Sequence, residues 1–239
     1  MTAPTQTADD AAQVAVTSET PISGRIDIVS DAICPWCYIG KRQLERALLT
    51  LAADGLRFDV HWNPFQLNPD MPKEGVDRAL YRAAKFGSAE RAAALDARVV
   101  EAAASVGLGF HPELIGRTPN TVDAHRVIWL AGTQGVQDTV VERLFDAYFV
   151  RGADIGRREA LAEEGSAAGL DGTAVAAFLD GQEATADVLR ADRAAREAGV
   201  DGVPSFFMDG HFLFSGAMPA ETMAAGLRRA WQILSARAA

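Results

Sequence analysis

Two cysteines, Cys34 and Cys37, stand two residues apart in the stretch DAICPWCYIG, and the chain contains no others. Two cysteines placed at random in a chain of this length would fall at this spacing only about once in a hundred. A disulfide that closes so short a loop would add only about 2 kcal/mol to the free energy of unfolding. The interpretations to separate are therefore a redox pair, half of a metal site and a haem attachment point.

The residues around the pair argue against a metal or a haem. A zinc site would need a second thiolate pair or suitably spaced histidines. The four histidines show no ligand spacing to one another: His61, His111, His125 and His211. Covalent haem attachment requires a histidine directly after the second cysteine, and Tyr38 stands there. A redox-active dithiol that needs no metal and no other cofactor is the interpretation that remains.

The sequence around the cysteines predicts a strand, a helix and a second strand. Residues 25–33 (RIDIVSDAI) form a short apolar run that is typical of a buried strand. A helix is predicted to follow from Pro35, because the first helical position tolerates a missing N–H. Residues 56–62 then alternate strictly between apolar and polar side chains, as a half-buried strand does. The dithiol is thus expected at a helix N-terminus inside a βαβ unit.

This position gives the two thiols different chemistry. Unpaired N–H groups and the positive end of the helix dipole stabilise a thiolate on Cys34, by at most about 2 kcal/mol from the dipole. Cys37 lies one turn inside the helix and is expected to be shielded. We therefore predict that Cys34 is the nucleophile and Cys37 the resolving thiol.

The rest of the chain divides at changes in composition. After the second strand the sequence becomes Ala-rich and helical in pattern, with room for five or six helices, and one of these is predicted to begin at Asn120 or Thr121. We expect an inserted, all-helical lobe. The predicted organisation has four segments: a disordered polar tail at 1–24, the βαβ unit at 25–70, the helical insertion at 71–199 and a closing unit at 200–239.

The sequence of the closing unit predicts a β-hairpin and a helix. Residues 205–208 and 211–214 read as two strands joined at Asp209-Gly210, a strong hairpin signal. A helix with one apolar face is predicted at about 220–234. The fold class is therefore α/β, with a βαβ unit, a helical insertion, a hairpin and a final helix.

Composition limits the partners. The net charge of −9 and the pI near 4.9 oppose binding to nucleic acid or to an anionic membrane, since phosphate recognition needs a basic stripe. No apolar run approaches the roughly 20 residues that a spanning helix needs. The polar tail has no Lys or Arg and no apolar block like that of a signal peptide, so we expect a cytoplasmic protein. The sequence makes no prediction of the oligomeric state.

Four stretches resemble a known family. DAICPWCYIGKRQLERAL, HWNPFQLNPDMP, PNTVDAHRVIWLA and GVPSFFMDGHFLFSGAMP together look like the DsbA family of thiol oxidoreductases. They are most similar to its cytoplasmic, FrnE-like branch, which is often found beside polyketide-biosynthesis genes. The resemblance covers about residues 25–234 and implies a thioredoxin fold interrupted by a helical insertion.

The resemblance also implies roles for single residues. Cys34 and Cys37 would be the catalytic couple, and Pro204 the cis-proline that faces them. Pro35 and Trp36, between the sulfurs, would tune the redox potential. Both are also candidates for substrate binding, together with Val203 before the cis-proline and with Asn120 and His125 from the PNTVDAHR stretch, which would line a groove opposite CPWC.

Two features set this chain apart from the strongly oxidising periplasmic members of the family. Those members resemble CPHC, whereas Trp36 can place no charge beside the thiolate, so we expect a less oxidising protein suited to reduction or isomerisation in the cytosol. They also carry a buried acid six residues before the first cysteine, where this chain has Ile28. Proton transfer to Cys37 therefore has no obvious agent other than water.

The function that follows is a thiol:disulfide oxidoreductase or isomerase acting on a protein or small-molecule thiol or disulfide. The first alternative is a glutathione-dependent isomerase or transferase, like the 2-hydroxychromene-2-carboxylate isomerases and kappa-class transferases, with glutathione as co-substrate. Those enzymes typically have Ser where Cys34 stands and usually lack the second cysteine. The other alternative is a non-catalytic binding or scaffold module in a biosynthetic complex.

Overall fold

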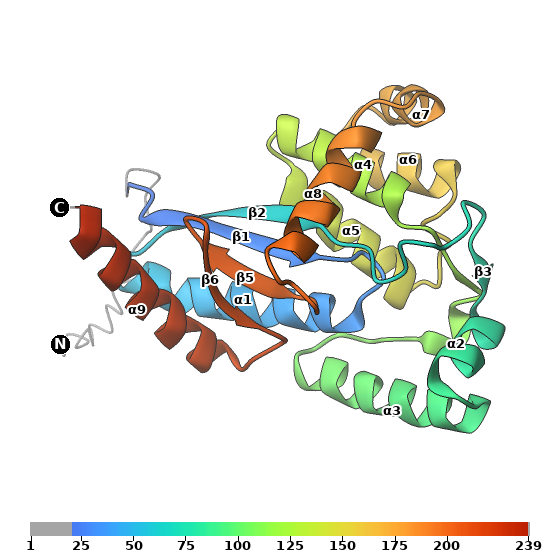
Figure 1. The fold of residues 1–239 in the computed structure, drawn as a ribbon, viewed down its shortest axis with the longest axis horizontal. Coiled ribbons are helices and arrows are strands. Elements are labelled where there is room, and N and C mark those ends of the chain that lie inside the picture. The colour runs from blue at the N-terminus through green and yellow to red at the C-terminus, as the bar shows by residue number, and fades with distance from the viewer. Residues whose placement is uncertain (1–20, 239) are drawn as a thin grey trace, which may run out of the picture.

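The computed structural model describes residues 21–238, and most of the tail predicted at 1–24 lies outside this range. The βαβ unit and the closing unit form one four-stranded sheet in the order β2-β1-β5-β6 (Figure 1). Strand β1 pairs in parallel with β2 and antiparallel with β5, which confirms the predicted βαβ unit and hairpin. The elements of this part are β1 (Gly24–Ser30), α1 (Pro35–Ala53), β2 (Phe58–Pro64), β5 (Ser205–Met208), β6 (His211–Ser215) and α9 (Ala220–Ala238).

The observed start of the sheet and the observed end of α9 both differ slightly from the predicted boundaries. Ser23 donates its backbone N–H to Arg57 O at 2.6 Å, and its hydroxyl accepts from Arg57 N at 3.1 Å. The sheet therefore begins before Arg25. At the other end α9 continues beyond the predicted residue 234, because no Gly or Pro interrupts its last turns.

Alternation along the strands separates the two faces of the sheet. Ile28 and its β5 partner Phe206 lie on the face that packs against α1 and α9, in the main core. Val29 and Phe207 belong to a second, smaller cluster that includes Ala195 of α8. The sheet is thus covered by α1 and α9 on one face and by α8 on the other.

The insertion is not all-helical, contrary to prediction. Two short strands pair antiparallel through Val76↔Thr118 and Asp77↔Arg117, and they close a loop that carries the first two helices. Seven α-helices are present where five or six were expected. The elements are β3 (Val76–Asp77), α2 (Arg78–Phe86), α3 (Ala89–Ser105), η1 (Pro112–Leu114), β4 (Arg117–Thr118), α4 (Val122–Thr133), α5 (Gln137–Phe149), α6 (Arg158–Ala167), α7 (Gly172–Asp180) and α8 (Thr185–Glu197).

The insertion joins the sheet through α1 and β2. The Tyr38 ring of α1 stacks on Phe145 of α5, with centroids 5.0 Å apart. Beside these rings the buried Lys41 ammonium lies 3.0 Å from the Asp138 carboxylate and 3.3 Å from that of Glu142, both on α5. Pairing of this kind is what lets a buried charge remain ionised. The helix that carries the cysteines is therefore fixed by both parts of the chain.

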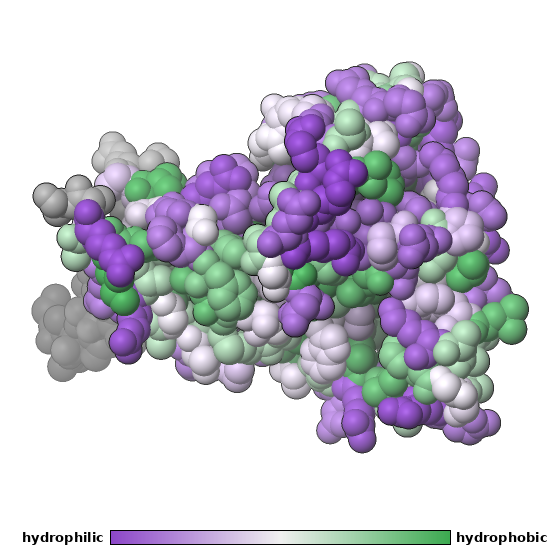
Figure 2. Space-filling view, in the orientation of Figure 1, coloured by the Kyte–Doolittle hydropathy of each residue, from purple (hydrophilic) through white to green (hydrophobic). Residues whose placement is uncertain are grey.

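The hairpin turns where the sequence predicts. Asp209 and Gly210 both adopt positive φ, 47° and 80°, as a two-residue hairpin turn requires. In the space-filling view (Figure 2) an apolar area covers this hairpin, and Phe212 is 58% exposed. No helix among residues 21–238 is long and apolar enough to span a bilayer.

Candidate active site

Asp31 shapes the turn that brings Cys34 to the start of α1. Its carboxylate is fully buried and accepts hydrogen bonds from the backbone N–H groups of Ile33, at 3.4 Å, and Leu67, at 2.7 Å. Its backbone oxygen accepts from Cys34 N at 3.0 Å. One side chain therefore ties the end of β1 to the segment after β2 and sets the direction in which the chain enters the helix.

Cys34 is the N-cap residue of α1, as predicted. Its backbone is extended, with φ −90° and ψ 113°, and no side chain caps the helix. Pro35 takes the first helical position, and Cys37 N donates to Cys34 O at 3.0 Å. Trp36 is 42% exposed beside the pair. Both cysteines are present as free thiols.

The two thiols differ in their surroundings. Cys34 is 4% exposed, and Cys37 has no exposed surface at all. Burial raises the pKa of Cys37 well above its usual range, and the adjacent Cys34 raises it further, while a hydrogen bond with the Ser30 side chain acts in the opposite direction. Cys37 is therefore held in its protonated form at neutral pH.

The Val203–Pro204 peptide bond is cis, which confirms the predicted isomer. The Cys34 thiol donates to the Val203 carbonyl oxygen at an Sγ–O distance of 3.5 Å. Gly40 on α1 makes room for the proline ring, since a Cβ at this position would lie 3.0 Å from Pro204 Cγ. Sequence analysis did not assign Gly40 a role.

A cleft with a volume of about 480 Å³ opens beside Cys34. Val203, Trp36 and Cys34 itself form one end, and the rest of the wall comes mostly from the insertion. In Figure 2 apolar residues gather where α3 faces the N-terminal end of α1. The insertion residues in the wall are Arg78, Tyr81, Arg82, Lys85, Phe86, Leu95, Asp96, Arg98, Val99, Val100, Phe110, Pro112, Ile115, Thr118, Tyr148 and Phe149.

This geometry agrees with the comparisons to known proteins. Residues 25–228 match the DSBA-like thioredoxin domain family. The chain belongs to this family. A crystal structure of a probable DsbA oxidoreductase from Streptomyces coelicolor is 33% identical, with a TM-score of 0.79 over 87% of this chain and 90% of that chain.

Two further matches are more distant. The uncharacterized protein YwbO of Bacillus subtilis is 25% identical over 186 residues, which cover 77% of this chain and 86% of YwbO. A 2-hydroxychromene-2-carboxylate isomerase structure is 16% identical, with a TM-score of 0.65 over 88% of this chain and 98% of that chain. This last likeness shows the shared fold alone. The fold alone therefore does not distinguish DSBA-like oxidoreductases from such isomerases. The distinction has to come from the cysteine pair.

The structure places Asn120 and His125 away from the expected groove. Asn120 donates to Met71 O at 2.7 Å and accepts from Val122 N at 3.0 Å, which secures the start of α4. The buried imidazole of His125 lies 3.1 Å from Phe65 O. Neither residue lines the cleft beside CPWC. Both side chains are used to join α4 to neighbouring loops, because their polar atoms find backbone partners there.

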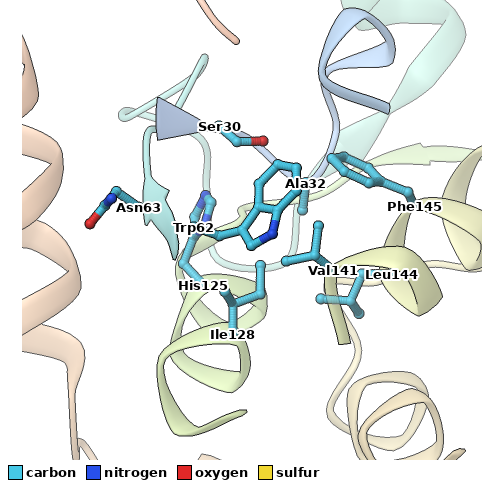
Figure 3. Close-up of a pocket in the computed structure, with 9 residues that line it drawn as sticks. All are labelled: Ser30, Ala32, Trp62, Asn63, His125, Ile128, Val141, Leu144 and Phe145. Atoms are coloured by element: carbon cyan, nitrogen blue, oxygen red, sulfur yellow. The ribbon is translucent and has the colours of Figure 1, made fainter. Parts of the chain in front are cut away.

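His125 lies instead beside a second, much smaller cavity. This space of about 10 Å³ lies among Ser30, Trp62 and residues of α4 and α5 (Figure 3). Its volume is about the minimum that a single water molecule requires. His125 Nε2 also approaches Asp31 Oδ1 at 3.6 Å. The polar side chains of Ser30, Asp31 and His125 thus lie at or near this cavity.

The buried acid that the family resemblance places six residues before Cys34 is absent, and a different acid lies near the dithiol. Ile28 is completely buried in the core, as its alternation predicts. Asp31 is the buried acid near the dithiol, and sequence analysis did not assign it a role. The sequence signal that could have identified Asp31 was an acidic residue directly after an apolar strand. The basic residues of α2 and α3 gave no comparable signal, since only the chain path brings them to Cys34.

Proposed function

We propose that this protein is a thiol:disulfide oxidoreductase that exchanges disulfides through Cys34 and Cys37. The observation that carries the proposal is the asymmetry of the dithiol: Cys34 caps α1 at the open cleft, whereas Cys37 is buried and protonated. A helix N-terminus favours negative charge on a sulfur at its cap. A nucleophile open to substrate and a protected resolving thiol are the two parts that such exchange needs.

In the reducing direction, the Cys34 thiolate attacks one sulfur of a substrate disulfide. A mixed disulfide forms on Cys34, and the other substrate sulfur leaves as a thiolate. Cys37 then attacks Cys34 Sγ, which releases the second substrate thiol and closes the Cys34–Cys37 disulfide. The proton of Cys37 passes to the leaving thiolate, so two electrons move from the protein to the substrate. The oxidising direction is the reverse.

An insulin-reduction assay tests the proposal. We expect turnover in the wild type and its loss in both Cys34→Ser and Cys37→Ser, since each thiol is needed for a complete exchange. Cys37→Ser should also accumulate a mixed disulfide on Cys34, detectable by intact mass. Absence of turnover in the wild type would favour a non-catalytic binding or scaffold module in a biosynthetic complex.

One observation keeps a second candidate function open. The cleft volume of about 480 Å³ is in the range of small-molecule sites. This would suit a glutathione-dependent isomerase or transferase, with glutathione as co-substrate. Glutathione-dependent turnover that survives in Cys37→Ser would support it, because such chemistry needs a single thiol.

We also propose the branch of the family, the cellular location and the direction of exchange. The CPWC motif and the exposed Trp36 support a cytoplasmic protein of the FrnE-like branch that works in the reducing or isomerising direction. Cell fractionation tests the location, and the redox state of the dithiol in freshly quenched cells tests the direction. A predominantly reduced pair would be consistent with reduction or isomerisation.

A further inference from the structure

The cleft beside Cys34 has a charge opposite to that of the whole chain. Four cationic side chains line it, Arg78, Arg82, Lys85 and Arg98, and one carboxylate, Asp96. The chain as a whole carries a net charge of −9. A cationic surface confined to one cleft of an acidic protein concentrates anions at that place.

The single carboxylate does not neutralise this charge. Asp96 is shared, since its Oδ1 lies 3.2 Å from Arg78 and 2.6 Å from Arg82. Within residues 21–238, the polar contacts of Lys85 are with neutral groups, the Tyr81 hydroxyl at 2.6 Å and the Asn68 side-chain oxygen at 3.2 Å. Among the described residues the cleft therefore has three more positive charges than negative ones.

Arg82 is also incompletely hydrogen-bonded. Its Nε is buried and has no hydrogen-bond partner in the described part of the chain. The desolvation that follows from this burial lowers its pKa, and Arg78 lowers it further. Arg126 provides the contrast, because Nε and both terminal nitrogens of its buried guanidinium all have partners. A buried donor without a partner is costly unless a ligand supplies one.

The remaining wall is apolar and aromatic. Phe110, Tyr148 and Phe149 line the cleft together with Val99 and Ile115. A bound molecule would therefore contact rings and aliphatic side chains as well as cations. Since Cys34 closes one end, a disulfide in the cleft would lie against the nucleophile.

We propose that the cleft selects small disulfides or thiols that carry a carboxylate on an aromatic or aliphatic body, with the carboxylate held by Arg82 and Arg98. The planar guanidinium fork of arginine matches a carboxylate. A volume of about 480 Å³ accommodates a small molecule of this kind. This inference rests on the proposed function, because it assumes that Cys34 attacks the bound disulfide.

A matched pair of disulfides tests the charge preference. Reduced protein is mixed in single-turnover experiments with 4,4′-dithiobis(benzoate) or with the neutral 4,4′-dithiobis(benzamide). Each rate constant is divided by that of dithiothreitol with the same disulfide, which removes the difference in intrinsic reactivity. We expect the wild type to prefer the benzoate about tenfold, the effect of one charge-assisted hydrogen bond, and the preference to decrease as salt is added.

Arginine variants locate the preference in the cleft. In Arg82→Gln and in Arg98→Gln the benzoate-to-benzamide ratio should fall toward one. Arg98 is exposed, so its variant tests the inference even if Arg82→Gln is unstable in thermal unfolding. Arg193→Gln, an exposed position on α8 outside the cleft, should retain the wild-type ratio.

The outcomes separate this inference from the proposed function. Equal corrected rates with both disulfides, or a ratio that both cleft variants leave unchanged, would overturn the inference and leave the dithiol function standing. If the protein reacts faster with an acidic disulfide-bonded peptide than with the benzoate, and if this reaction depends on Arg82, the substrate is a polypeptide. That result would overturn the inference of a small-molecule substrate. No exchange with any disulfide would contradict the proposed function and the inference with it.

Discussion

At the scale of the residue, the two sulfurs of CPWC are chemically unequal because one helical turn separates the thiol that lines the cleft from the thiol that does not. Cys34 borders the cleft, whereas Cys37 does not line it and has no exposed surface. The resolving thiol is thus protected from reagents until a mixed disulfide forms beside it. Its burial has a consequence for stability that can be measured.

The stability of the reduced protein should decrease at alkaline pH because of Cys37. Burial raises the pKa of this thiol in the folded state, whereas in the unfolded chain a thiol ionises near about pH 8.5. Above that pH the unfolded chain loses a proton that the folded chain keeps. The contribution of Cys37 is therefore fully present below about pH 8.5 and is lost as the pH rises, by about 1.4 kcal/mol per pH unit for one proton.

Urea unfolding of the reduced protein between pH 7 and 10, with a phosphine reductant present, measures this effect. The Cys37→Ala variant is the reference, since it keeps every other titrating group. The free energy of unfolding of the wild type should fall more steeply than that of the variant. Parallel curves would show that Cys37 ionises alike in both states.

Trp36 should keep the dithiol less oxidising than the CPHC members of the family. It is exposed beside Cys34 and has no charge with which to stabilise a thiolate. Equilibration with glutathione buffers should give a reduction potential clearly below about −120 mV, the value of a strong oxidant. Trp36→His should shift it upward, because a protonated imidazole stabilises the reduced form. Trp129→His, at the similarly exposed tryptophan of α4, serves as the control.

At the scale of the element, α1 and the loop before β5 have to approach closely for Cys34 to face Pro204. Gly40 allows this contact, because any side chain there would press on the proline ring. The Asp31 turn sets the position of the helix start from the other side. The site therefore joins the start of α1 to two segments that are distant in sequence, the one after β2 and the one before β5.

Gly40→Ala should lower the rate of disulfide exchange, since the new Cβ lies 3.0 Å from Pro204 Cγ and displaces the ring or the helix. The matched control is Gly226→Ala on α9, where the nearest atom would be 3.4 Å away. There alanine should add about 0.5–1 kcal/mol to the free energy of unfolding through its helix propensity, with exchange unchanged. Insulin turnover and urea unfolding of both variants measure the two effects. Equal gains in stability with unchanged turnover would contradict the role of Gly40.

At the scale of the whole molecule, the sheet and the insertion share one core. The same cluster of buried side chains includes Ile28 and Phe206 of the sheet and continues through Phe145 to Leu161 and Val175. The ion pairs of Lys41 reinforce this contact. The helical lobe and the sheet consequently pack as one unit.

A shared core predicts that both parts unfold together. In a Trp129→Phe variant the remaining tryptophans, Trp36, Trp62 and Trp231, all lie outside the insertion, so fluorescence follows the sheet and its helices, whereas far-UV circular dichroism is dominated by the helices of the insertion. In urea the two signals should give coincident, single transitions. Separate midpoints would indicate that the insertion is an independent folding unit, contrary to the continuous core.

The sequence by itself determined the elements around the dithiol, because those signals are local. The strand before Cys34, the helix from Pro35, the hairpin at Asp209-Gly210 and the family motifs all depend on neighbouring residues. The helical character of the segment after β2 also followed from the sequence, but its two-stranded sheet did not, since two-residue strands carry too short a pattern to recognise.

Only the tertiary structure decided what surrounds the sulfur atoms. The burial of Asp31, the placement of His125 away from the groove and the contact of Gly40 with Pro204 each depend on segments distant in sequence. The cleft is the clearest case, because α2 and α3 show ordinary surface-like patterns of charge. Their arginines line one cleft beside Cys34 only because the chain folds them there, since the distance between charges depends on the tertiary structure and not on sequence order.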